Sequence, residues 1–289
     1  MFHDESLDII GIQEGRLQSA VKSGVHYEMY FGQPSKCGAH GCQVWIARDR
    51  KPKLLCAISH SARLLTVHAL LSENNTEVFA VAAHAPTEGA ESAVKDAFWD
   101  MLVKVILSAR ASVPHANIIL MIDANSRVGS VVSSGIGAFQ PELENENGSR
   151  FRAFLETCHM WAINTFVAAG QTWRSTYGTW HRLDYICLQM GTNAVLARTT
   201  TDSNIDLSTT ARVDHLALVS SIVAAPVPKK QTKMTPKFKV NPLHLQESAR
   251  ILKFRDLLAD HQLSLHGDID DMLQARVEHI KKSAKIAFG

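Results

Sequence analysis

The sequence lacks the features that mark several large classes of protein. Its longest apolar runs, around 64–71 and 215–225, are much shorter than the roughly 20 residues of a membrane-spanning helix. The N-terminal residues MFHDESLD carry acids where a secretory signal has a basic and then an apolar segment. A net charge of only +2 does not by itself require a polyanionic partner, so a nucleic-acid surface would need local clusters of Lys and Arg. We therefore expect an intracellular protein without a membrane partner.

Cysteine is also scarce, and five residues form an odd set that argues against a disulfide framework. The stretch Cys37-Gly-Ala-His40-Gly-Cys42, with Cys56 and His60 downstream, contains the residue types that bind zinc. However, no Cys pair has the two-residue gap of a zinc knuckle. The Gly-rich stretch is interpreted more simply as a turn before a strand.

The sequence does contain many short apolar or alternating stretches. One helix is expected to start at the cap Thr87 and to include Val105, and a second to cover 148–158. Strands in runs with few helices predict an α+β sandwich, with two sheets packed face to face and helices outside, rather than a doubly wound sheet. The expected strands are 8–13, 25–31, 42–47, 54–58, 62–71, 76–83, 117–122, 160–166, 182–189, 194–200 and 215–223.

The composition changes after Ala225. The segment 226–239 has three Pro and five Lys but no acid, which is typical of a linker. Beyond it, 243–260 and 269–286 show helical periodicity, with Asp268 as the expected N-cap of the second helix. We therefore expect a body at 1–225, a linker at 226–242 and a helical extension at 243–289. A helical pair buries its apolar faces poorly alone, which predicts continuation into another domain.

Polar side chains stand at the ends of several expected strands. Strand ends are stiff, so they can hold groups where a hard cation and a phosphate need them, and such a cation prefers carboxylate and amide oxygens. The residues are Glu14, His84, Asp123, Asn125, Asp184, Asp214 and His215.

Asp123 and Asn125 should project to one side of an extended segment. A carboxylate can hold a metal or accept a proton from water, and an amide can donate to a phosphate oxygen; phosphodiester hydrolysis needs both. The alternative is an Asx turn that caps the strand.

Asp184 is an acid within a strand that otherwise looks buried, where an unpaired carboxylate would be costly. It needs a partner, and His215 would serve. The pair Asp214-His215 could present an ionisable imidazole, or His215 could be a core histidine. Glu14 could equally be a solvated acid, and Pro86 restricts His84 without indicating a role.

The combination of these blocks is more specific than any one of them. The blocks come in the order and rough spacing of the endonuclease/exonuclease/phosphatase superfamily. Over about residues 7–223 the chain resembles the apurinic-type endonuclease domain of non-LTR retrotransposons, and 226–289 resembles the linker to reverse transcriptase. The matching blocks are Glu14, His-Ala-Pro-Thr at 84–87, Asp-Ala-Asn at 123–125, Thr172-Trp173, Arg182-Leu-Asp184-Tyr and Asp214-His215.

The resemblance implies a DNase I-like fold, a four-layer sandwich of two mainly antiparallel sheets flanked by helices. It also implies that Glu14 binds a divalent metal, Mg²⁺ or Mn²⁺, with Asp214 nearby. Asp123 would orient or deprotonate the attacking water, or protonate the leaving oxygen. The implied roles of the remaining site residues are a phosphate contact for Asn125, transition-state stabilisation by His215 oriented by Asp184, and a phosphate contact for His84, where many relatives have Tyr.

DNA contacts are expected from side chains on loops near this site. The expected residues are Arg16, Arg127, Thr172, Trp173, Arg174, His181, Arg182 and Arg212. For each arginine, the alternative is a solvated surface position.

The chain departs from the family in one respect. Relatives begin with a strand carrying an Asn that helps organise the metal site, and this sequence starts after the matching position. We therefore expect one core strand of the sheet to be missing, which would expose backbone donors and acceptors on its neighbours.

The expected function is that of an Mg²⁺-dependent DNA-nicking endonuclease, nuclear in an active retrotransposon and joined to a reverse transcriptase of the same polyprotein. One alternative is a hydrolase of the same fold that acts on abasic DNA, RNA or a phosphorylated small molecule. Another is a catalytically silent remnant that binds nucleic acid.

Overall fold

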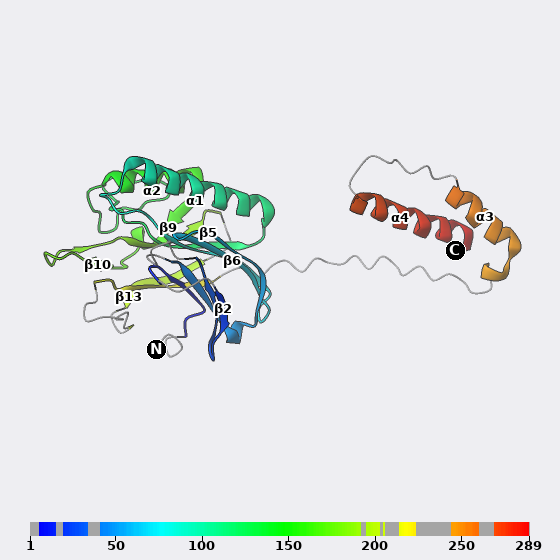
Figure 1. The fold of residues 1–289 in the computed structure, drawn as a ribbon, viewed down its shortest axis with the longest axis horizontal. Helices are drawn as coiled ribbons and strands as arrows, with labels where there is room; N and C mark the ends of the chain where they lie inside the picture. Colours follow the sequence, from blue (N-terminus) through cyan, green and yellow to red (C-terminus); the bar gives the residue numbers. More distant parts are fainter. Residues whose placement is uncertain are drawn as a thin grey trace. The chain divides into compact units, whose positions relative to one another are not determined.

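The computed structural model describes residues 6–15, 20–33, 41–191, 195–202, 205, 214–223, 244–259 and 269–288. The chain divides into two compact units, Met1–Pro228 and Lys229–Gly289 (Figure 1). The expected linker at 226–242 and the expected cap Asp268 lie outside the described residues. In the described part of the chain, no helix is both long and apolar enough to cross a membrane.

The first unit is built on a six-stranded sheet with the order β5-β6-β7-β8-β12-β9. All neighbours are antiparallel except β7 and β8, whose connection contains the helix α1 (Ser92–Ser112). A parallel pair needs such a crossover, because the chain must return to the same end of the sheet. The strands are β5 (Pro52–Ser61), β6 (Leu64–Leu71), β7 (Thr76–His84), β8 (Asn117–Asp123), β12 (Asp184–Gln189) and β9 (Met160–Ala162).

A second layer of strands packs against one face of this sheet. It contains a four-stranded antiparallel sheet with the order β1-β4-β3-β2 and a separate pair, β13 and β14. Val44 and Ile46 of β4 are fully buried against Val67 of β6 and Ala80 of β7. The strands are β1 (Ile9–Ile12), β2 (Ala20–Ser23), β3 (Tyr27–Phe31), β4 (Gln43–Ala47), β13 (Val195–Asp202) and β14 (Ala217–Val223).

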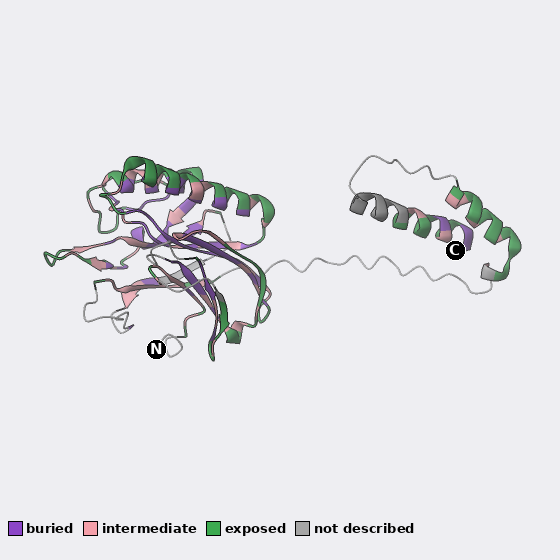
Figure 2. Cartoon of the chain, in the orientation of Figure 1, coloured by how far each residue is buried: buried purple, intermediate pink, exposed green. Residues whose placement is uncertain are grey.

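Two helices, α1 and α2 (Glu146–Thr157), cover the other face of the six-stranded sheet. Their inner sides are buried and their outer sides are exposed (Figure 2). Leu102 of α1 and Phe151 of α2 join a core that includes Leu120 of β8 and Tyr185 of β12. The predicted α+β sandwich of two mainly antiparallel sheets with helices outside is thus confirmed.

The first helix begins later than predicted, at Ser92 instead of directly after Thr87. The Thr87 carbonyl accepts from the backbone N–H of Ala90, which closes a turn before the helix. The Glu88 carboxylate accepts from the backbone N–H groups of Glu146 and Asn147 at the start of α2, at 3.1 and 3.2 Å. Glu88, which was expected in the first turn of α1, therefore accepts hydrogen bonds from the free backbone N–H groups at the N-terminus of α2.

Short elements also differ from the prediction. The strand expected at 160–166 ends at Ala162, where a 3₁₀ turn, Ile163–Thr165, follows. The strand β2 was not predicted, nor was the small hairpin of β10 (Trp173–Arg174) and β11 (Trp180–His181).

The second unit contains the predicted helical extension. A 3₁₀ turn, His244–Gln246, precedes α3 (Ser248–Ala259), and α4 is Ile269–Phe288. The rings of Phe254 and Phe288 lie 5.2 Å apart between centroids, so the two helices pack against each other.

Candidate active site

The central strands bring three of the predicted site residues to one edge of the six-stranded sheet. His84 ends β7, Asp123 ends β8, and Asp184 begins β12. The register places Asp123 between the other two, beside His84 and beside Asp184. Because β7 and β8 are parallel and β12 is antiparallel to β8, the two C-terminal ends meet one N-terminal end there.

His215 joins this group from the segment just before β14. Its Nδ1 lies 3.0 Å from Asp184 Oδ2, as predicted for this pair. Burial alone would lower the pKa of His215, but the hydrogen bond to Asp184 and the charges of Asp184, Asp123 and Asp214 outweigh it and raise the pKa to about 9. The imidazole is therefore a cation near neutral pH, held by a carboxylate.

Asp184 is itself held by its neighbours. The hydroxyl oxygen of Thr172 accepts from the backbone N–H groups of Leu183 and Asp184, at 3.0 and 3.1 Å. The side-chain amide of Asn164 donates to the Asp184 carbonyl at 2.9 Å. Thr172 is fully buried, so its role is to position Asp184 rather than to contact DNA as predicted. The sequence carried no signal for Asn164.

Asp123 is buried at 8% exposure. Burial, followed by the negative charge of Asp184, raises the pKa of the Asp123 carboxyl to about 7. The backbone N–H of Asn125 donates to Asp123 Oδ1 at 3.0 Å, which closes an Asx turn. The Asx turn, one of the two alternatives that the sequence left open, is thus present. The Asn125 side-chain amide also donates to the Ala85 carbonyl at 3.0 Å.

His84 and Glu14 lie on the other side of Asp123. His84 Nε2 is 3.7 Å from Asp123 Oδ2 and 3.8 Å from Glu14 Oε1. His84 is buried at 3% exposure, whereas the Glu14 side chain is half exposed and its backbone has a φ of +55°. Arg63, which sequence reasoning missed, donates to the carbonyls of His84 and Ala85, each at 3.3 Å.

The carboxylates and imidazoles at this edge can be compared with the predicted metal ligands. Asp123, Asp184 and His215 each offer one ligand atom, and these atoms lie within 4.8 Å of one another. In the described part of the chain, this group contains neither Glu14, which contacts His84, nor Asp214, which is exposed. The acidic cluster thus centres on residues that were predicted to be catalytic.

The predicted DNA-contacting residues fall into separate groups. Arg16 and Arg212 lie outside the described residues, and Arg127 is half buried. Trp173 stacks on His181 with 5.9 Å between ring centroids, and the exposed Arg174 lies over Trp180.

Arg182 contradicts its prediction as a DNA contact. It is buried at 2% exposure. Its guanidinium donates to the carbonyls of Asn164, Phe139 and Gln140. The side chain therefore ties the 139–140 loop to the core, because three backbone acceptors would otherwise lack donors.

Glu142 is a further residue that the sequence did not indicate. Its Oε2 lies 2.6 Å from His181 Nδ1, and its Oε1 accepts from the backbone N–H of Arg182 at 2.7 Å. Glu142 thereby fixes the ring on which Trp173 stacks.

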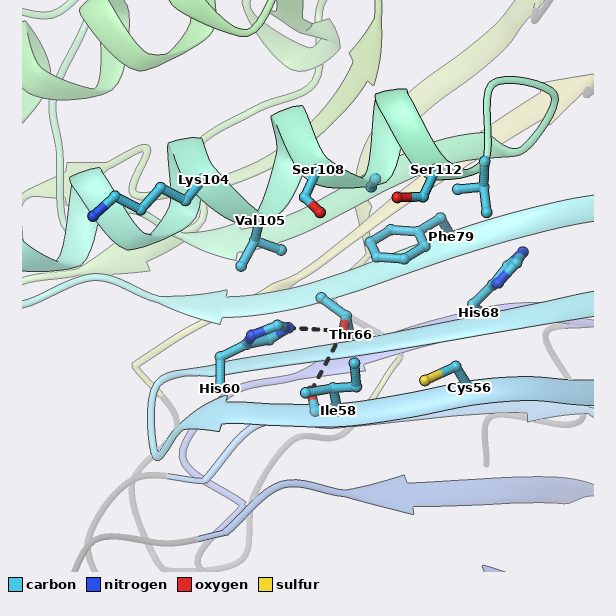
Figure 3. Close-up of a pocket in the computed structure, with 12 residues that line it drawn as sticks. Cys56, Ile58, His60, Thr66, His68, Phe79, Lys104, Val105, Ser108 and Ser112 are labelled. Carbon is cyan, nitrogen blue, oxygen red and sulfur yellow. Dashed lines mark hydrogen bonds between the residues drawn. The ribbon is translucent and has the colours of Figure 1, made fainter. Parts of the chain in front are cut away.

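A groove of about 370 Å³ lies elsewhere, between α1 and strands β5, β6 and β7 (Figure 3). His60 reaches Thr66 Oγ1 at 3.0 Å there, and burial lowers the pKa of His60. The groove lining shares no residue with the cluster around Asp123. We therefore assign the candidate active site to the strand ends.

The two raised pKa values predict a loss of stability with rising pH in metal-free protein. The folded protein binds protons at Asp123 and His215 more tightly than the unfolded chain does. The free energy of unfolding therefore falls as rising pH removes these protons. The Asp123 contribution is present below about pH 4 and lost toward about 7; that of His215 is present below about 6.5 and lost toward about 9.

We therefore expect the Tm in EDTA to fall as the pH rises from about 4 to about 9. In the His215→Asn variant, the fall in Tm above about pH 7 should be absent. Calorimetry across pH measures both. A Tm that rises through the window would contradict the assigned pKa shifts.

Comparison with known proteins finds relatives only by structure, since no protein-family model and no curated protein matches the sequence. The endonuclease domain of TRAS1, a telomere-specific non-LTR retrotransposon, matches with a TM-score of 0.55 at 14% identity, over 76% of this chain and 88% of that chain. The AP endonuclease LMAP from Leishmania major matches with 0.57 at 14%, over 78% and 80%. A 3′ phosphatase from Neisseria, NExo, bound to a product DNA hairpin, matches with 0.54 at 13%, over 75% and 89%. The chain therefore has the DNase I-like fold that these three structures share.

Proposed function

We propose that the protein is a metal-dependent phosphodiesterase that nicks DNA. The observation that carries this proposal is the contact of 3.0 Å between His215 and Asp184 next to the buried Asp123. This edge combines a cationic imidazole with a carboxyl whose pKa, about 7, suits proton transfer near neutral pH.

The donor set fits a hard divalent cation such as Mg²⁺ or Mn²⁺. Carboxylate oxygens are its preferred ligands, and the Asp184 charge that raises the pKa of Asp123 would be offset by a cation. In this proposal Glu14 holds the ion, with Asp214 near it. A bound cation would supply Lewis acidity toward the phosphate and lower the pKa of a bound water.

The residues of the chain then have distinct tasks. His215 Nδ1 is engaged by Asp184, which leaves Nε2–H to donate to a phosphate oxygen whose negative charge grows in the transition state. Asp123 accepts a proton from the attacking water or gives one to the leaving oxygen. One N–H of the Asn125 amide is bound to the Ala85 carbonyl, and the second can donate to the phosphate. His84, buried beside Asp123, supports the same edge from β7.

DNA is the substrate that the surroundings favour. The β10–β11 hairpin begins beside His215 and carries the aromatic and basic side chains Trp173, Arg174, Tyr177 and Trp180. Tyr177, at its turn, is 95% exposed. Aromatic rings stack on bases, and arginines contact phosphates. A closed small-molecule pocket would not require such a projecting element.

A role in retrotransposition is the finer part of the proposal. It is supported by the matched blocks from Glu14 to His215 and by the likeness to the TRAS1 endonuclease. In that role the enzyme would act in the nucleus, expose a 3′ hydroxyl for priming, and work with a reverse transcriptase of the same polyprotein. A hydrolase of abasic DNA or RNA remains the second candidate, because the fold is shared with an AP endonuclease.

Plasmid nicking tests the proposed function directly. We expect the full chain to convert supercoiled plasmid to open circles with Mg²⁺ and not with EDTA. Abasic duplex and RNA of the same length, assayed in parallel, separate the second candidate. A folded chain that binds DNA without cutting any of these substrates would instead support a silent binding module.

Removal of one aromatic ring tests the hairpin. We expect Trp173→Ala to raise the Kd for single-stranded DNA by about tenfold, because base–aromatic stacking contributes about 1–3 kcal/mol per base. Fluorescence anisotropy at several salt concentrations measures the effect. Phe166→Ala removes another partly exposed ring, 40% exposed, and is the matched control. Equal losses in the two variants would contradict a specific role for the hairpin.

A further inference from the structure

The backbone ladder between β7 and β8 ends at the edge of the sheet that carries the candidate active site. Its last pair is His84 and Asp123, and just beyond it the backbone N–H of Ala85 donates to the Asp123 carbonyl at 2.8 Å. The next residue, Pro86, has no backbone N–H to donate. Ala85 and Pro86 are both buried, so their carbonyls need donors from elsewhere in the protein.

Side-chain amides supply these donors. The Asn125 amide donates to the Ala85 carbonyl at 3.0 Å. The Asn147 amide donates to the Pro86 carbonyl at 2.8 Å and to the Asn125 carbonyl at 3.2 Å. Asn147 can bridge the segments that follow β7 and β8, because an amide group has two N–H donors. We call the two amides and these three carbonyls the amide clamp.

Asn147 is itself held by the start of helix α2, of which it is the second residue. Its backbone N–H donates to the Glu88 carboxylate at 3.2 Å, and the same carboxylate accepts from the Asn145 amide at 2.9 Å. A group on a fixed helix end can position its neighbours. The Asn147 side chain is fully buried, so it does not contact a substrate, and any effect on catalysis passes through Asn125.

Asn125 is the residue in the site that most needs such support. Its backbone is left-handed, with a φ of +46°. This conformation costs free energy in a residue other than glycine, although Asn tolerates it better than most. In this conformation the Asn125 backbone N–H donates to Asp123 Oδ1 while its side chain donates to the Ala85 carbonyl. The hydrogen bond from Asn147 to the Asn125 carbonyl therefore stabilises a strained residue beside Asp123.

We infer that Asn147 is a positioning residue of the active site, which holds Asn125 and Asp123 in the arrangement that the reaction needs. The inference rests on the proposed function, in which Asn125 contacts the phosphate and Asp123 transfers a proton. Without the Asn147 amide, the Pro86 and Asn125 carbonyls lose their donor and Asn125 relaxes from its left-handed conformation. A misplacement of about 1 Å in such a site can lower a rate by about a hundredfold.

Two matched substitutions test the effect on the reaction. Asn147→Ala removes the amide at the site, and Asn117→Ala is the control. The Asn117 amide donates to the Glu77 carbonyl at 3.0 Å, so it joins the same two strands at their opposite ends. We expect Asn147→Ala to lower the single-turnover rate constant of Mg²⁺-dependent plasmid nicking by at least about tenfold, with the Kd for DNA in EDTA changed by less than about twofold. Asn117→Ala should leave both within about twofold.

Amide hydrogen exchange, followed by NMR in EDTA, gives a measurement that needs no activity. We expect the backbone N–H groups of Ala85 and Asn125 to exchange about tenfold faster in Asn147→Ala than in the unaltered chain, and at an unchanged rate in Asn117→Ala. Glu88→Ala removes the exposed carboxylate that holds the Asn147 backbone, and it should give a smaller change of the same kind. This second variant tests the clamp even if Asn147→Ala does not fold.

The outcomes separate this inference from the proposed function. Unchanged exchange at Asn125 in a folded Asn147 or Glu88 variant would overturn the inference. An equal loss of nicking in Asn147→Ala and Asn117→Ala would also overturn it, as would faster exchange with an unchanged nicking rate. If the unaltered chain cut no DNA but the exchange rates changed as expected, the proposed function would fail, and the positioning of Asn125 by Asn147 would be supported.

Discussion

Replacement of His215 by alanine is expected to lower the rate of Mg²⁺-dependent plasmid nicking by about a thousandfold. The imidazole is positively charged near neutral pH because Asp184 holds it at 3.0 Å, so its loss removes a fixed donor where phosphate charge develops. Single-turnover cleavage of a labelled plasmid measures the effect. DNA affinity should change little, because the contribution arises mainly in the transition state.

The control for this substitution is Asp100→Asn, which changes an exposed acid on the outer side of α1. Its nicking rate should stay within about twofold, since surface substitutions away from a site are nearly neutral. If His215→Ala and Asp100→Asn retained equal activity in a folded chain, the assigned active site would be wrong.

Replacement of Arg182 by alanine should destabilise the first unit by about 3 kcal/mol, since it removes a buried cation that serves three carbonyls. Urea unfolding followed by tryptophan fluorescence measures this change. All five tryptophans lie in the first unit, so the signal reports on that unit alone.

Arg174→Ala serves as the control, because its expected effects on stability and on DNA binding are the opposite of those of Arg182→Ala. Arg174 is exposed over Trp180, so its loss should alter stability by no more than about 0.5 kcal/mol while weakening DNA binding and its salt dependence. If Arg182→Ala left stability unchanged and weakened DNA binding, the original prediction of a DNA contact would be restored.

Long, strongly patterned strands could be predicted from sequence. The expected strands at 62–71, 76–83 and 117–122 correspond to β6, β7 and β8 within two residues at each end. Each has at least seven residues in the structure, enough for side-chain alternation or apolar content to be visible. The strands β2, β10 and β11 have only two to four residues, too few to show a period.

The sequence also indicated which polar side chains would meet at these strand ends. Asp123 stands at the end of an apolar strand, and Asp184 is a carboxylate within a buried one, so both required an explanation beyond packing. The residues that position them could not be found this way. Thr172 and Asn164 look like ordinary polar residues in the sequence. Their side chains hydrogen-bond to backbone groups of Asp184, more than ten residues away.

The sequence by itself determined the sandwich architecture and the types of polar residue at the strand ends, because side-chain alternation and strand-end polarity are local properties of the chain. The tertiary structure alone decided the use of each side chain. It joined His215 to Asp184 across 31 residues, buried Arg182 against distant carbonyls, and left β1 and β14 unpaired with each other. These outcomes depend on which strands become neighbours, and strand pairing is set by the packing of the whole unit rather than by any one segment.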